Sequence, residues 1–125
     1  MKQLFKIDLA AAVDIGAMDG LTAATHAVTK TLFLDIVAVL TRNGIAPGEI
    51  PAKIEGLAFG KDIGRRDTKL HTLWIANDDD FLQTTTDSNG NQIPNPNQFF
   101  VFGFTDADLG GSAFVPRFKD GDGGN

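Results

Sequence analysis

The chain has 125 residues, of which 42% are hydrophobic and 22% charged, and this is the composition of a globular protein rather than a disordered one. Its formal net charge of −5 argues against nucleic acid as a main partner, because binding phosphates requires a basic surface. Cysteine is absent, which excludes disulfides and thiolate metal sites, and no apolar run is long enough to span a membrane.

The first third of the chain predicts two strands and one helix. Residues 3–9 alternate between apolar and polar side chains well enough for a strand, and residues 28–34 form the next one. Between them, residues 10–27 are rich in Ala, Gly and Thr, so we expect a loop with at most a short helical turn. Asp35 is a suitable N-cap for the only real helix that the pattern predicts, over residues 35–43.

The remainder predicts three more strands. Residues 54–59 and 72–76 are apolar and β-prone, and a charged segment joins them. Residues 98–105 form the last strong strand and contain four phenylalanines in six positions.

Two polar segments complete the chain. Residues 84–97 predict a long excursion that turns at Asn89-Gly90, and the oxygen side chains around this turn lack the closing Glu of a calcium loop. Residues 110–125 are small and polar, and we expect a flexible tail there.

Acidic side chains gather where two of these strands should meet. Glu55 lies in the 54–59 strand, and the 72–76 strand runs into an acidic turn. Calcium binds six to eight oxygen ligands, often from carboxylates and carbonyls at a turn. The predicted metal ligands are Glu55, Asn77, Asp78 and Asp80. The alternative is a solvated turn, because Asn and Asp are favoured in turns whether or not they bind an ion.

A bound cation at these residues would allow hydrolysis without a serine nucleophile. The cation polarises an acyl or phosphoryl oxygen and lowers the pKa of a water, with carboxylates as ligands or general base. The candidate catalytic residues are Glu55, Asp78 and His71, and the candidate substrate-binding residues are Lys53, Arg65 and Arg66. A Ser112–His71 pair is the serine-based alternative, although Ser112 lacks the Gly-x-Ser-x-Gly setting of an α/β-hydrolase.

Several segments resemble the C-terminal portion of the phytase-like esterase family. These are Pro-Ala-Lys-Ile-Glu-Gly-Leu-Ala-Phe-Gly at 51–60, Trp-Ile-Ala-Asn-Asp-Asp-Asp-Phe at 74–81 and Asn-Gln-Phe-Phe-Val-Phe-Gly-Phe at 97–104. The resemblance extends over most of the chain but over only the last part of the family's usual length. Asp79 departs from the family's more frequent Asp-Asn-Asp-Phe.

The resemblance implies a mainly β fold that forms part of a β-propeller, about one blade plus flanking strands, and makes the chain a single domain or a fragment of a larger propeller. It also implies a secreted or periplasmic hydrolase acting on a small-molecule carboxylic or phosphoric ester, although the first residues lack the apolar core of a signal peptide. Calcium is the cofactor expected from the acidic turn.

Other interpretations stay open at the level of sequence. The fold alternative is a small α+β domain. The functional alternatives are a non-catalytic calcium-stabilised binding or assembly module and a truncated remnant with no activity of its own. Open strand edges and the Phe-rich strand 98–104 favour self-association into a homo-oligomer.

Overall fold

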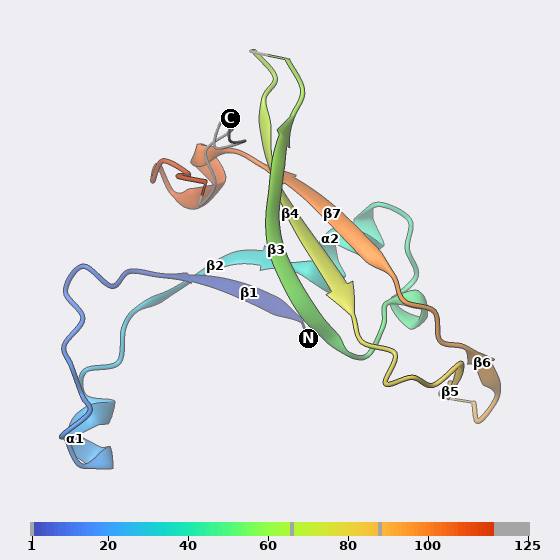
Figure 1. Cartoon of the computed structure of the whole chain (residues 1–125), viewed down its shortest axis with the longest axis horizontal. Helices are drawn as coiled ribbons and strands as arrows, with labels where there is room; N and C mark the ends of the chain where they lie inside the picture. The colour runs from blue at the N-terminus through green and yellow to red at the C-terminus, as the bar shows by residue number, and fades with distance from the viewer. Residues whose placement is uncertain (1, 66, 88, 117–125) are drawn as a thin grey trace, which may run out of the picture. The chain divides into compact units, whose positions relative to one another are not determined.

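The computed structural model describes residues 2–65, 67–87 and 89–116 (Figure 1). Within these residues, seven strands form three small sheets, with 36% of residues in strands and 17% in helices. The predominance of strands confirms the mainly β prediction over the α+β alternative. A propeller blade has four strands, whereas the largest sheet here has three, so the propeller stays a prediction. No described helix is both long and apolar enough to cross a membrane.

The chain divides into two compact units, Met1–Ile45 and Ala46–Asn125. In the first unit, β1 (Gln3–Ile7) pairs antiparallel with β2 (Lys30–Asp35), with a bulge between Leu4 and Phe5. These are the two strands that alternation predicted, each shifted or shortened by about two residues.

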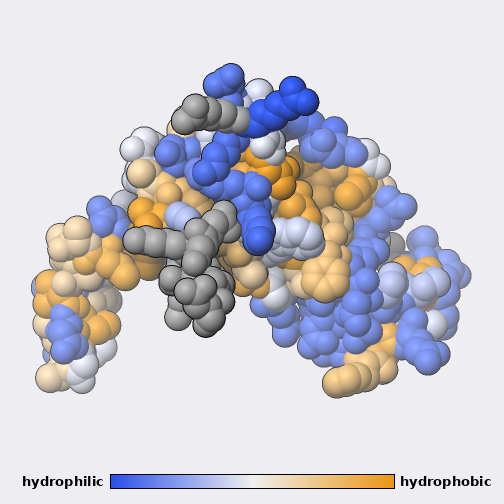
Figure 2. Space-filling model, turned by 45° about the horizontal axis from the view of Figure 1, so that its top comes forward, coloured by the Kyte–Doolittle hydropathy of each residue, from blue (hydrophilic) through white to orange (hydrophobic). Residues whose placement is uncertain are grey.

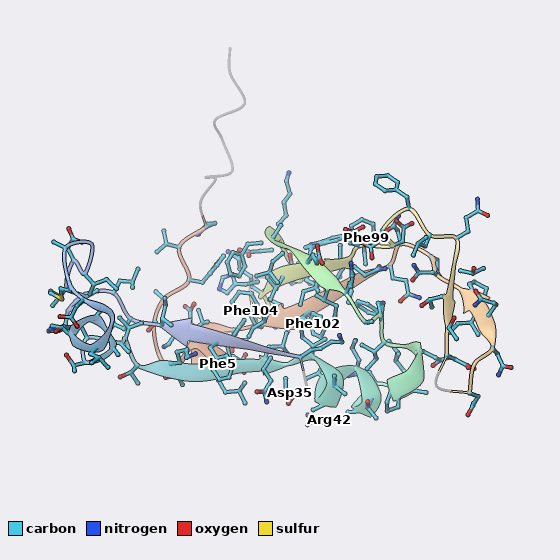
Figure 3. All side chains as sticks on the ribbon, turned by 90° about the horizontal axis from the view of Figure 1, so that it is seen from below. Phe5, Asp35, Arg42, Phe99, Phe102 and Phe104 are labelled. Atoms are coloured by element: carbon cyan, nitrogen blue, oxygen red, sulfur yellow. The ribbon has the colours of Figure 1, made fainter. Side chains whose placement is uncertain are left out.

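Two helices belong to this first unit. The helix α2 (Ile36–Arg42) begins at Asp35, whose carboxylate accepts a hydrogen bond from the Ala38 amide at 2.9 Å, and this confirms the predicted cap. Asp35 caps the start of α2 and Arg42 is its last residue, and both are labelled in Figure 3. The shorter α1 (Gly20–Ala24) is the helical turn expected within the loop, and Asp19 caps it.

The second unit is built on a three-stranded antiparallel sheet in the order β3–β4–β7. Its strands are β3 (Ile54–Ile63), β4 (Leu70–Asn77) and β7 (Phe99–Phe104), so β4 is central. A short 3₁₀ turn, η1 (Pro47–Glu49), precedes β3, and another, η2 (Asp106–Leu109), follows β7. The β3 strand continues four residues beyond the predicted end, and the connection to β4 begins at Gly64, which has φ +95°.

Register determines which side chains share a face of this sheet. Leu73 lies opposite Phe59 on one side and Phe102 on the other, so all three belong to one face. Leu73, Ile75, Phe102 and Phe104 are buried on that face and form much of the apolar core of the described residues. Figure 3 shows Phe102 and Phe104 on the same side of β7, with Phe99 on the other. Apolar residues also remain on the surface, where Figure 2 shows them between hydrophilic segments.

The predicted excursion contains a small hairpin. Its strands β5 (Thr84–Thr86) and β6 (Gln92–Pro94) are antiparallel, and Gly90 in the turn has φ +84°. The Asp87 carboxylate accepts hydrogen bonds from the amides of Asn89 and Asn91 at 2.9 and 2.8 Å. This carboxylate therefore organises a turn, as the sequence predicted, while the two strands were not predicted.

Candidate functional site

The acidic residues predicted as metal ligands lie at one end of the β3–β4 pair. Lys53 and Asp78 continue the pairing just beyond the strands, where the Asp78 amide donates to the Lys53 carbonyl at 3.2 Å. Glu55 falls in an irregularity of the register, between residues that pair with Asn77 and Ala76. The sequence prediction that Glu55 and the acidic turn share one end of a strand pair is therefore confirmed as a placement.

Lys53 occupies the centre of these charges. Its ammonium forms an ion pair with the Asp80 carboxylate. The hydrogen bond to Asp80, with the negative charges of Asp80, Glu55 and Asp78, raises the pKa of Lys53 above its usual range. The Lys53 ammonium is thus a cation of the chain itself that is held among these carboxylates.

Backbone amides donate hydrogen bonds to two carboxylates of the acidic turn. The Asp78 carboxylate accepts from the Asp80 amide, and the Asp79 carboxylate accepts from the Phe81 amide, both at 2.9 Å. Asp80 and Phe81 have φ of 52° and 59°, a conformation uncommon for residues other than glycine. This turn is a tightly bonded structure rather than a set of unused carboxylates.

Asn77 and Asp79 tie the turn to the segment before β7. The buried Asn77 side chain accepts from the Gln98 amide at 2.6 Å and donates to the Pro96 carbonyl at 3.2 Å. Asp79, the residue that departs from the family pattern, accepts from the Asn97 side chain at 2.9 Å. Within the part of the chain that the structure describes, no three His, Asp or Glu side chains are arranged to hold a metal ion.

His71 lies at the opposite end of β4 from the acidic turn. His71 and Asn77 are six positions apart in β4, which corresponds to roughly 20 Å along a strand. The structure therefore does not bring His71 together with Glu55 and Asp78, the two residues with which the sequence grouped it as catalytic. The predicted strand over residues 72–76 already implies this separation, because His71 precedes that strand and Asp78 follows it.

A different set of side chains surrounds His71. Its Nδ1 lies 2.8 Å from Asp62 Oδ1 at the end of β3, and its Nε2 lies 3.4 Å from Asp106 Oδ1 in η2. The rings of Phe104 and Phe114 lie against the imidazole, with centroids 5.3 and 4.7 Å away. Only 15% of the His71 side chain is exposed. The histidine is thus held between two carboxylates and two aromatic rings.

Asp62 is ionised and fixed from two sides. The Lys69 ammonium lies 2.6 Å from Asp62 Oδ2, and His71 holds the other oxygen. The hydrogen bond to Lys69, followed by that to His71, lowers the pKa of Asp62 below its usual range. A carboxylate held in this way can fix both the orientation and the tautomer of a histidine.

Sequence reasoning missed Asp62 and Asp106 as partners of His71. A hairpin pairing across the turn at Gly64 would have suggested Asp62, because the paired ends of β3 and β4 bring residues 62 and 71 together. Asp106 reaches His71 only through β7 and η2, and no local pattern indicates that. Arg65 forms part of the β3–β4 turn through its backbone, and Arg66 lies outside the described residues.

Comparison with known proteins assigns the chain to a family. No curated protein and no solved structure matches the chain. A family model described as Phytase-like, esterase-like activity of phytase, matches residues 1–81, which is more than half of the chain and includes Lys53, Glu55, Asp62 and His71. This match indicates a hydrolase-like function. The chain therefore belongs to the phytase-like family.

Proposed function

We propose that this chain hydrolyses an ester bond and that His71 serves as its general acid and base. The observation that carries the proposal is the 2.8 Å contact between His71 Nδ1 and Asp62 Oδ1, in a chain that belongs to a hydrolase-like family. An imidazole oriented by a carboxylate is the arrangement that hydrolases use to move a proton at neutral pH.

The chemistry follows from the two ring nitrogens. With Nδ1–H donating to Asp62, the neutral imidazole presents Nε2 as a proton acceptor. Nε2 takes a proton from a water molecule as the water oxygen attacks the ester carbon or phosphorus. The same Nε2–H then protonates the departing alkoxide as its bond to that centre breaks. Asp62 acts as a positioning residue and stabilises the imidazolium between the two steps.

The first test is turnover by the purified chain. Nitrophenyl acetate and nitrophenyl phosphate serve as substrates, each measured with calcium and with excess chelator. We expect hydrolysis of at least one of them above the rate in buffer alone, and the preferred substrate distinguishes carboxylic from phosphoric esters. Hydrolysis of neither substrate, by the folded native chain or by the folded Phe114→Ala variant, would refute the proposal.

A second candidate function is a calcium-stabilised module without catalysis. It is favoured by the concentration of negative charge that raises the pKa of Lys53. In their present positions these carboxylates do not form a metal site, so calcium would have to displace the Lys53 ammonium from Asp80. Glu55, Asp78, Asp80 and the Asn77 carbonyl would then be the available oxygen ligands.

Replacing Lys53 with methionine tests the calcium candidate. The substitution frees Asp80, so 5 mM calcium should raise the melting temperature of Lys53→Met by about 5 °C more than that of the native chain, for a dissociation constant near 0.5 mM. Adding Glu55→Gln should abolish the gain. Lys61→Met, which removes an exposed lysine elsewhere on β3, is the matched control. Equal calcium responses in the native chain, Lys53→Met and Lys61→Met would exclude a calcium site at this turn.

Two features implied at the level of sequence stay proposals. A secreted or periplasmic location is supported by the resemblance alone. Self-association is supported by the open edges of β3 and β7 and by Phe99, which is 69% exposed. Sedimentation velocity would test self-association, since a single monomeric species at high concentration would contradict it.

A further inference from the structure

The residues that follow β7 lie directly over the proposed catalytic histidine. We call residues 106–114 the C-terminal strap; it begins with η2 and ends at Phe114. The family match ends at residue 81, so His71 and Asp62 lie inside the matched region and the strap lies outside it.

One carboxylate of the strap occupies the working side of His71. Asp106 Oδ1 lies 3.4 Å from Nε2, the nitrogen that must exchange a proton with water or substrate. The same oxygen accepts a hydrogen bond from the Phe114 amide at 2.7 Å, which joins the two ends of the strap. While the Asp106 carboxylate remains there, neither a substrate nor a water molecule can approach Nε2 from the side that Asp106 occupies.

Phe114 covers the imidazole itself. Its ring centroid lies 4.7 Å from that of His71 and 4.8 Å from that of Phe59, and it meets Phe104 edge-on at 5.3 Å. Aromatic contacts of this kind stabilise packing beyond the area that they bury. Phe114 thus attaches the strap to the sheet through contacts with three aromatic rings.

The geometry of the strap suits an element that can open. Two left-handed glycines, Gly110 and Gly111, with φ of 69° and 83°, connect η2 to the Phe114 end. Asp106 is 53% exposed, and the residues on both sides of Phe114 are exposed as well. Most residues of the strap are exposed, and an exposed segment opens at a lower free energy than the sheet beneath it.

We propose that the C-terminal strap is an autoinhibitory cover of His71, which must lift before an ester can reach Nε2. This proposal rests on the proposed function for its inhibitory role. Whether the strap covers His71 does not depend on any catalytic activity, and it is tested separately by the chemical accessibility of His71.

Accessibility of His71 is measured with diethyl pyrocarbonate, which acylates a neutral imidazole nitrogen and releases carbon dioxide and ethanol. His26, in the first unit and exposed, provides an internal reference within the same sample. In Phe114→Ala combined with Asp106→Asn, we expect His71 to be modified about tenfold faster relative to His26, because the ring contacts that close the strap are lost. Val115→Ala is the matched control, since Val115 follows Phe114 and is 82% exposed.

Hydrolysis of nitrophenyl acetate by the same proteins tests the inhibitory role. Faster modification together with faster hydrolysis supports the proposal, and an unchanged modification rate overturns it. Faster modification with hydrolysis slower than that of the native chain overturns the inhibitory role. If no protein hydrolyses any ester but His71 is modified faster in the double variant, the proposed function fails and the cover on His71 is supported. Melting curves of each variant test whether the sheet remains folded. Phe114→Leu is a milder variant for the case in which Phe114→Ala unfolds.

Discussion

Replacing His71 with glutamine is expected to lower the rate of ester hydrolysis by about 100-fold or more, since positioned general acids and bases contribute typically 10²–10⁴-fold. Glutamine can still hydrogen-bond to Asp62, but its amide cannot take a proton from water and return it to an alkoxide. The measurement is the initial rate on the better nitrophenyl ester, together with a melting curve of the variant.

Two further variants separate chemistry from folding. His26→Gln removes the other histidine of the chain, which lies in the first unit, and should leave the rate unchanged. Asp62→Asn should lower kcat while KM stays close to its native value, because Asp62 orients the imidazole without touching substrate. A folded His71→Gln protein that retains the native rate would remove His71 from the mechanism.

Replacing Gly64 with alanine is expected to destabilise the protein by about 2–4 kcal/mol, a large effect for a single substitution. Gly64 turns the chain from β3 into β4 with φ +95°, a conformation that residues with a Cβ rarely adopt. A Cβ at this position would also lie against the Thr68 carbonyl oxygen, which is part of the backbone and cannot rotate away. The free energy of unfolding, from denaturant titration, measures the effect.

Gly90→Ala is the control for this substitution. Gly90 has a similar φ of +84° in the β5–β6 turn, but an added Cβ would meet no atom within 4 Å. Its substitution should therefore cost only the conformational strain, about 1 kcal/mol. If the two variants lose equal stability, the clash at Thr68 contributes nothing. Because the Gly64 turn places Asp62 beside His71, Gly64→Ala should also weaken hydrolysis in the fraction that remains folded.

Much of the fold follows from local sequence patterns. The alternation in residues 3–9 and the apolar run at 72–76 indicated β1 and β4, because the side-chain period of a strand is visible in the sequence. Asp35 and the Asn89-Gly90 pair marked a helix cap and a hairpin turn, because these residue types are favoured at such positions. The hairpin strands β5 and β6 were missed because three-residue strands are too short to show a period.

The candidate site was only partly accessible from sequence. Glu55 and Asp78 were correctly placed at one end of a strand pair, but the ion pair between Lys53 and Asp80 was not anticipated. The sequence offered Lys53 as a substrate ligand, whereas the structure shows its ammonium held by neighbouring carboxylates. Residue types alone do not reveal which of several nearby charges will pair.

The sequence by itself determined the mainly β class, the capped helix at Asp35 and the family resemblance, since each depends on residues close together in the chain. Only the tertiary structure decided that His71 meets Asp62, Asp106 and Phe114. Those contacts depend on the register of the β3–β4 hairpin and on the path of the chain after β7. A shift of one residue in that register would turn each β4 side chain to the opposite face, so packing over the whole sheet fixes the surroundings of His71.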